Sequence, residues 1–432
     1  MNKMQLSLKN IFKKTLIKDL AKVVVFDFFA RFILCLVSIV LIRMLSPKEY
    51  SVFTKLFSLA YLFNGIFGAG TGVAFVRKIA EDDSSNTHSQ DVSLHFCGIV
   101  TIFFFFLVSL ILSPYIARAY KLSIFLTGFA LLYGFVLCIL DLNKYFYQGK
   151  EQYVKSGILN VSSLLFIVLP IFICFFFQIH PTINGLISMY IFAGAIACSI
   201  TSFIIYKSSR FTCKNISVPR YKSMLSESSW LIVYYSILAV MNQCNIILMS
   251  RYSDELQIAC YGVALKYYSL LLMVLPVIHT VLRVKTSHKE YTQDAGKCRT
   301  FVFSWLKTTG PAGIVLIPFF IFGAHLVLPY LNGVKYNAAI PVLDIFIVGA
   351  MISLVFAPNV PILMAMHRHG LMCLYVFIGL AVNVIGFLLT SGMGALSAAF
   401  WTVAANAVLN ISSTLTIIWH SRNVIAQEEK TV

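Results

Sequence analysis

Residues 41–59 read LIRMLSPKEYSVFTKLFSL, and residues 249–267 read MSRYSDELQIACYGVALKY. Aligned at an offset of 208 residues, the two stretches place Arg43 over Arg251. A second pair of stretches agrees at an offset of 209 residues: NGLIS at 184–188 and MGALS at 393–397. Because two separate pairs give nearly the same offset, the sequence predicts two halves that share one fold.

The composition around these stretches excludes a water-soluble protein. The chain has 432 residues, of which 59% are hydrophobic and 12% charged, and its mean hydropathy is +0.83. A soluble domain carries about 25% charged residues, so this chain has too few to solvate a globular surface. The sequence therefore predicts an all-α integral membrane protein.

Twelve stretches are long and apolar enough to cross a bilayer, which takes about 20 residues each. They lie at about 22–44, 51–75, 94–117, 122–142, 154–177, 183–206, 228–250, 256–282, 303–329, 338–365, 371–391 and 395–420. Pro358 and Pro361 predict a break in the tenth span. The connections are short, so we expect no sizeable domain outside the membrane.

The repeat and the spans together predict twelve transmembrane helices in two pseudo-symmetric six-helix bundles around a central cavity. The expected organisation is a basic amphipathic segment at the membrane surface (1–21), an N-terminal bundle (22–206), a linker (207–227), a C-terminal bundle (228–420) and a tail (421–432).

The net charge of +17 concerns orientation rather than nucleic acid. Nucleic-acid-binding proteins expose a basic surface to water, whereas here Lys and Arg flank membrane spans, so no nucleic-acid partner is expected. With the N-terminus inside, 24 of the 34 Lys and Arg residues lie in cytoplasmic segments and 7 in outer ones. Because cytoplasmic loops carry the excess, both termini are predicted to be cytoplasmic.

Five motifs occur in order along nearly the whole chain. They are IRMLSPKEYSVF (42–53), IFGAGTGVAFVRK (66–78), YQGKEQYVKSGIL (147–159), PYLNGVKYNAAIPVLDIF (329–346) and GMGALSAAF (392–400). Within a twelve-span chain, this series resembles the multidrug/oligosaccharidyl-lipid/polysaccharide exporter superfamily, specifically the O-antigen flippases of its polysaccharide-transport branch. Ser51 departs from the glycine usual in the first motif. Lipid II flippases of this superfamily usually have two further C-terminal spans, so twelve spans favour the O-antigen type.

The resemblance implies a flippase, not an enzyme, in the bacterial inner membrane. Such a protein moves an undecaprenyl-diphosphate-linked oligosaccharide from the cytoplasmic to the outer leaflet by alternating access, coupled to a proton or cation. The expected partners are that lipid-linked oligosaccharide, membrane lipids, a polysaccharide polymerase and a chain-length regulator. No cofactor is expected, and the sequence has no CxxC pair that would indicate a metal site.

Four cations lie within or beside the predicted spans, and we predict that they bind the diphosphate: Arg31, Lys55, Lys266 and Lys307. Ionisable groups at membrane depth cost several kcal/mol unless they face protein or water. Lys266 lies near the middle of its span with no acidic residue within one turn, which favours a place in the cavity. Lys55 and Lys307 lie near span ends, where reaching the interface is an equal alternative.

Three further residues are candidates for ion coupling: Asp27, Asp344 and Asn383. Asp27 lies one helical turn before Arg31, where it either poises that arginine or merely neutralises it. Asp344 lies in the outer turns of its span. An amide such as Asn383 usually bonds between helices, but the resemblance implies a cation site between spans 7, 11 and 12.

Two other functions remain as alternatives. An antiporter that exports organic cations would need acidic groups to dominate its cavity, whereas the in-span charges here are mainly basic. A membrane polymerase or glycosyltransferase would need a sizeable outer loop with arginine or carboxylate clusters, and the outer loops here are only a few residues long.

Overall fold

The computed structural model describes residues 25–431, except 27, 82–87, 209–215, 276–277, 280–281, 283–294 and 367. All regular elements in these ranges are helical. Residues 28–44 form the first of them. The others are α2 (Pro47–Asn64), η1 (Gly65–Ala69), α3 (Gly70–Glu81), α4 (His88–Ile111), α5 (Ser113–Tyr120), α6 (Ile124–Gly149), α7 (Tyr153–Phe176), α8 (Ile183–Ser208), α9 (Val218–Glu227), α10 (Ser229–Tyr252), α11 (Glu255–Leu271), η3 (Leu272–Val274), α14 (Ala295–Asn332), η4 (Val334–Ala339), α15 (Ile340–Val355), α16 (Asn359–Ala365), α17 (His369–Leu389), η5 (Ser391–Met393) and α18 (Ala395–Thr431).

Within the described ranges, eleven helical segments are long and apolar enough to cross a membrane. The helix over 28–44 fits the remaining predicted span. The predicted all-α membrane fold is therefore confirmed, and the chain is a multi-pass membrane protein. The tenth span is broken as its prolines predicted, because α15 ends at Val355 and α16 begins at Asn359 directly after Pro358.

The two halves start their second spans in the same way. At the start of α2, the Ser46 hydroxyl accepts a hydrogen bond from the Glu49 amide, while the Glu49 carboxylate accepts one from the Ser46 amide. At the start of α11, the Asp254 carboxylate accepts a hydrogen bond from the Gln257 amide at 2.7 Å. Ser46 and Asp254 are 208 residues apart, which is the offset of the sequence repeat, and both satisfy free amides at a helix start.

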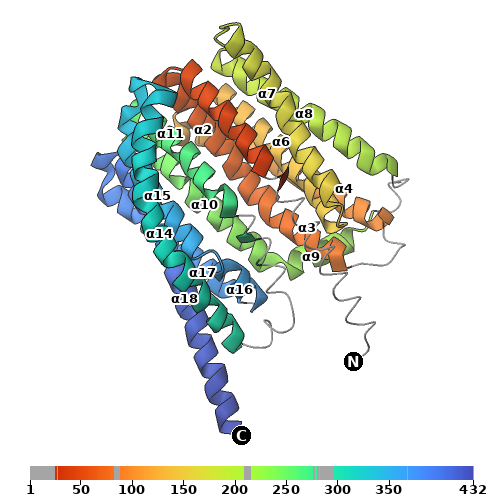
Figure 1. Cartoon of the computed structure of the whole chain (residues 1–432). Coiled ribbons are helices and arrows are strands. Elements are labelled where there is room, and N and C mark those ends of the chain that lie inside the picture. The colour runs from red at the N-terminus through yellow and green to blue at the C-terminus, as the bar shows by residue number, and fades with distance from the viewer. Residues whose placement is uncertain are drawn as a thin grey trace.

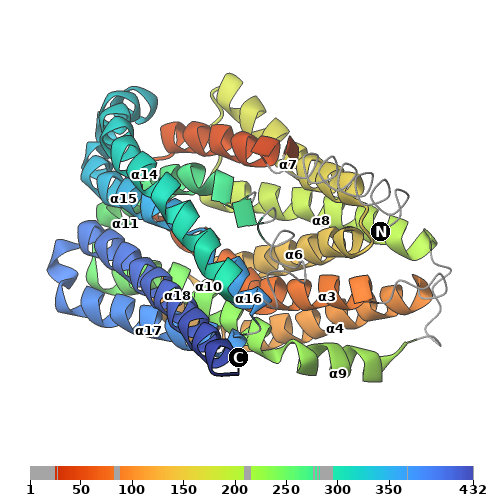
Figure 2. The ribbon, with the colours of Figure 1, turned by 60° about the horizontal axis from the view of Figure 1, so that its bottom comes forward.

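The helices group into two bundles that meet along a central seam. Figure 1 shows α4, α6, α7 and α8 on one side and α14, α15, α17 and α18 on the other, with α2, α10 and α11 between them. Figure 2, seen from another direction, shows the same separation. At the seam, α2 packs against α10 and α11, and η1 packs against α10.

Glycine allows the closest approach across this seam. A Cβ atom on Gly262 of α11 would lie 2.3 Å from the Thr54 hydroxyl of α2, and one on Gly70 of α3 would lie 2.8 Å from the Ile232 Cα of α10. Real side chains cannot fit at these distances. The missing side chains therefore let the backbone of one bundle approach a side chain of the other at Gly262 and its backbone at Gly70.

Candidate substrate cavity

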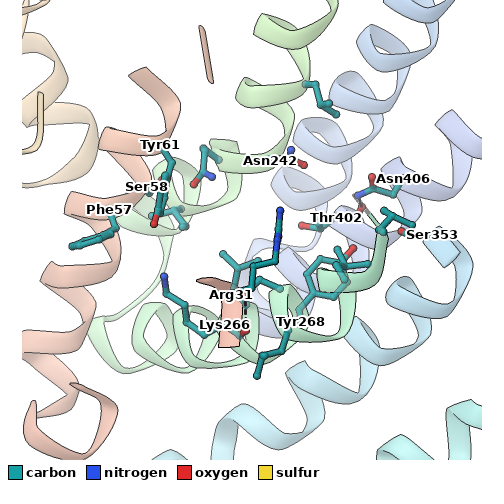
Figure 3. A pocket seen from close by; sticks show the side chains of 18 of the residues that line it. Arg31, Phe57, Ser58, Tyr61, Asn242, Lys266, Tyr268, Ser353, Thr402 and Asn406 are labelled. Atoms are coloured by element: carbon teal, nitrogen blue, oxygen red, sulfur yellow. Dashed lines mark hydrogen bonds between the residues drawn. The ribbon is translucent and has the colours of Figure 1, made fainter. Parts of the chain in front are cut away.

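A cavity of about 610 Å³ lies between the two bundles. One wall comes from the first helix, α2, α6 and α8, and the other from α10, α11, α15, α18 and the segment after α15. Figure 3 shows Phe57, Ser58 and Tyr61 on one side of this space, with Thr402 and Asn406 on the other. The central cavity predicted from the repeat is thus present.

Arg31 and Lys266 both line the cavity, and Figure 3 shows the two side chains between the walls. The Lys266 ammonium lies 5.6 Å from the ring centre of Phe57 and 5.8 Å from that of Tyr61. Aromatic faces attract cations, so these rings hold the lysine toward the N-terminal bundle. Within the described part of the chain, no carboxylate pairs with Lys266, and no Asp or Glu lines the cavity.

Lys55 and Lys307 do not line this cavity. Lys55 is buried in α2 at 4% exposure, while Lys307 is exposed on α14. Of the four predicted cations, the structure therefore brings only Arg31 and Lys266 together in one space. Asp27 lies outside the described residues, so its relation to Arg31 stays a prediction.

The two walls carry different polar groups. On the N-terminal wall, Tyr133 and Tyr190 pack edge to face with ring centres 5.6 Å apart, and Tyr61 lines the cavity beside them. The C-terminal wall presents Tyr234 and Tyr268 and also amides, from Asn242 and Gln243 of α10 and from Asn406 and Asn410 of α18. Composition alone could not assign these side chains to a cavity, because the same residue types also bond between helices.

Asn383 lies in a buried amide cluster rather than at the cavity wall. The Asn245 side-chain nitrogen donates to Asn383 Oδ1 at 2.9 Å, to the Ala398 carbonyl at 3.0 Å and to Thr402 Oγ1 at 2.6 Å. Asn383 in turn donates to the Met241 carbonyl at 3.2 Å. The cluster joins α10, α17 and α18, and the Asn245 side-chain oxygen is buried without a hydrogen-bond partner in the described structure.

Asp344 lies far along the chain from this cluster, on α15. Its carboxylate pairs with the His325 ring of α14 at 3.0 Å, and the two side chains are 27% and 52% exposed. Neither residue lines the central cavity. The pair was not evident from the sequence because 19 residues and a turn separate the two positions.

A second carboxylate bonded within the protein is that of Asp141 on α6. It accepts a hydrogen bond at 2.9 Å from Asn64, the last residue of α2. Asn64 directly precedes the π-helical turn η1. Such turns occur often at functional sites, but hydropathy gives no signal for one.

Cations close one end of the bundles. The Arg43 guanidinium donates to the carbonyls of Tyr330 and Leu331 at the end of α14. The Lys335 ammonium donates in return to the carbonyls of Arg43 and Leu45 at 3.1 and 2.8 Å. The hydrogen bonds of Arg43 therefore run between the two bundles. We call this set of contacts the end clamp.

At the other end of the bundles, α9 is attached to the N-terminal bundle. Asp91 of α4 pairs with Lys150 and with Arg220 of α9, both at 3.2 Å. Burial lowers the pKa of Lys150, and the Asp91 carboxylate opposes that change. The linker helix is therefore held by a half-buried ion pair network rather than by apolar packing alone.

Comparison with known proteins decides the family. A family model described as "Polysaccharide biosynthesis protein" matches residues 16–282, more than half of the sequence. The chain belongs to this polysaccharide biosynthesis protein family. No curated protein matches the sequence significantly.

The fold of this family member is shared with solved transporters. Lipid II flippase MurJ in an inward closed conformation is similar at a TM-score of 0.69 and 14% identity, covering 91% of this chain and 86% of that chain. An inward-facing multidrug resistance MATE transporter of the MOP superfamily is similar at a TM-score of 0.70 and 14% identity, covering 93% of this chain and 96% of that chain. The eukaryotic MATE transporter AtDTX14 is similar at a TM-score of 0.65 and 16% identity, covering 96% of this chain and 98% of that chain. At these identities the likeness is one of fold, and it agrees with the two-bundle membrane fold predicted from the sequence.

Proposed function

We propose that this chain is a flippase for an undecaprenyl-diphosphate-linked oligosaccharide, such as an O-antigen repeat unit. The observation that carries the proposal is a cavity between two bundles with Arg31 and Lys266 in its lining and no acidic residue among its described lining residues. A diphosphate is an anion that accepts hydrogen bonds, so it favours a space with unneutralised cations.

The mechanism follows from this placement. Arg31 comes from the N-terminal bundle and Lys266 from the C-terminal bundle, so a diphosphate between them contacts both halves. Each bundle would present its cation differently in the two states of alternating access, because the bundles move relative to one another. A substrate shifts such an equilibrium only by binding the two states unequally. The lipid tail would stay in the bilayer while the sugar crosses the cavity.

We further propose that a monovalent cation gives the exchange its direction, with Asn383 among its ligands. Three neutral oxygens, from Asn383, Ala398 and Thr402, converge on the Asn245 side-chain nitrogen, so a bound cation would take the place of that nitrogen, with the unpaired Asn245 oxygen as a further ligand. The described residues contain no cluster of three His, Cys, Asp or Glu side chains. Divalent cations prefer carboxylate ligands, so neutral oxygens favour a monovalent cation. Asp27 and Asp344 stay candidates for a proton.

The same proposal places the protein in the bacterial inner membrane, with both termini in the cytoplasm. The 24-to-7 distribution of Lys and Arg supports this orientation. The end clamp would then lie on the outer side. A polymerase and a chain-length regulator would act on the product after it reaches the outer leaflet.

An organic-cation antiporter is the second candidate, since several of the solved structures with this fold are MATE transporters. The chemistry of the lining opposes it, because two cations without a described carboxylate repel a cationic drug. Drug sensitivity of a deletion strain separates the two functions.

The decisive variants are Lys266→Met and Arg31→Gln, each expressed in the deletion strain with surface polysaccharide as the readout. Losing a charge-assisted contact of about 1.5–3 kcal/mol should weaken substrate binding about tenfold or more. Lys307→Met is the matched control, because Lys307 is exposed on α14 and outside the cavity. Full surface polysaccharide in both cavity variants would refute the cationic-cavity mechanism.

A further inference from the structure

The amides of α18 form a regular ladder along the cavity wall. The Asn406 side-chain nitrogen donates to the Thr402 carbonyl at 2.8 Å, and the Asn410 nitrogen donates to the Asn406 carbonyl at 2.8 Å. Figure 3 shows the first of these bonds. Each amide therefore bonds to the carbonyl one helical turn before it.

This bonding fixes where the oxygen of each amide lies, and it uses one of the two N–H donors of each amide. Only the NH₂ group can donate to a carbonyl oxygen, so the side-chain oxygen must be the other end. Neither Asn406 Oδ1 nor Asn410 Oδ1 accepts a hydrogen bond from the described part of the chain. Both residues line the cavity. The ladder thus presents two acceptor oxygens that receive no hydrogen bond from the described part of the chain.

Acceptor oxygens discriminate between the two polar parts of a lipid-linked glycan. A diphosphate diester has only acceptors, so it gains nothing from Asn406 Oδ1 or Asn410 Oδ1 and is repelled by them. Sugar hydroxyls and N-acetyl groups carry donors, and such donors match these oxygens. Asn242 and Gln243 of α10 also line the cavity, and their side chains have no hydrogen bond within the described structure.

We propose that the α18 amide ladder, together with Asn242 and Gln243, is the glycan-binding face of the cavity, while Arg31 and Lys266 hold the diphosphate. This inference rests on the proposed function and assigns its two ligand groups to two separate sets of residues. Sugar selectivity then lies on the C-terminal wall. Because hydrogen bonds to neutral amides are weak individually, the face holds the glycan loosely enough to release it.

The test compares two lipids on purified protein by native mass spectrometry. One is undecaprenyl diphosphate without sugar. The other is the lipid-linked oligosaccharide extracted from cells in which this chain has been deleted, so that its own substrate accumulates. The double variant Asn406→Leu/Asn410→Leu should bind the glycan-bearing lipid about tenfold more weakly and bind sugar-free undecaprenyl diphosphate unchanged. Retained binding of the sugar-free lipid also demonstrates a folded cavity.

Two controls separate failure of this inference from failure of the proposed function. Asn184→Leu makes the same amide-to-leucine change at an exposed position of α8 outside the cavity and should leave both affinities unchanged. Lys266→Met should weaken the binding of both lipids. Equal losses for both lipids in the double variant, or no loss for either, would overturn the glycan-binding face. Wild-type affinity of Lys266→Met for both lipids would overturn the proposed function instead.

Discussion

At the scale of single residues, buried polar groups decide both stability and chemistry in this protein. Asn245 satisfies three oxygens from α17 and α18 with one amide nitrogen. Lys266 contacts aromatic faces, with no carboxylate partner among the described residues. The isolation of Lys266 in an apolar span predicts a place in the cavity, and Lys266 does line it. The sequence could not rank Asn245 above other amides, because partners 138 to 157 residues away are invisible to spacing.

The amide cluster gives a prediction at this scale. Asn383→Ala removes an acceptor from Asn245 and a donor from the Met241 carbonyl, which should cost about 1–3 kcal/mol of stability. Thermal unfolding in detergent measures the loss.

If a monovalent cation binds here, sodium chloride should raise the unfolding temperature of the wild type above that in choline chloride of equal ionic strength. The same sodium effect in the variant would exclude Asn383 as a ligand.

At the scale of elements, the sequence predicted the spans well and their distortions partly. Apolar runs determine where helices cross the membrane, and Pro358 marked the break between α15 and α16. The π-helical turn at Gly65–Ala69 carries no such mark. It depends on contacts with α10, where the Ser236 hydroxyl donates to the Ile66 carbonyl at 3.2 Å. A backbone distortion stabilised by a distant helix cannot be read from local composition.

The end clamp leads to a prediction about how the two bundles open. Arg43→Ala with Lys335→Ala removes the side-chain donors that bind carbonyls across the two bundles. Without them, the clamped end should open more often. A cysteine introduced in place of Thr54, which lines the cavity, should then react faster with a membrane-impermeant maleimide added from outside intact cells. The comparison is made in a background lacking the native cysteines, and an unchanged labelling rate would exclude a gating role for the clamp.

At the scale of the whole molecule, two related bundles enclose a basic cavity with unlike walls. The repeat offset of 208 predicted equivalent starts for the second span of each half, and Ser46 and Asp254 both cap their helices there. The confinement of the lining amides to the C-terminal wall was not predictable, since it depends on which helix faces turn inward. The family match supports a role in polysaccharide biosynthesis, and the two cations in the lining favour an anionic cargo.

Transbilayer movement in reconstituted vesicles tests that claim most directly. The lipid-linked oligosaccharide is placed in both leaflets, and a membrane-impermeant glycosidase outside measures how much of it reaches the outer leaflet. Our account predicts that wild-type protein and Lys307→Met expose the inner pool to the enzyme, while Lys266→Met does so far more slowly. If the lipid of the inner leaflet stays as protected from the enzyme in vesicles with wild-type protein as in vesicles without protein, the flippase function is contradicted.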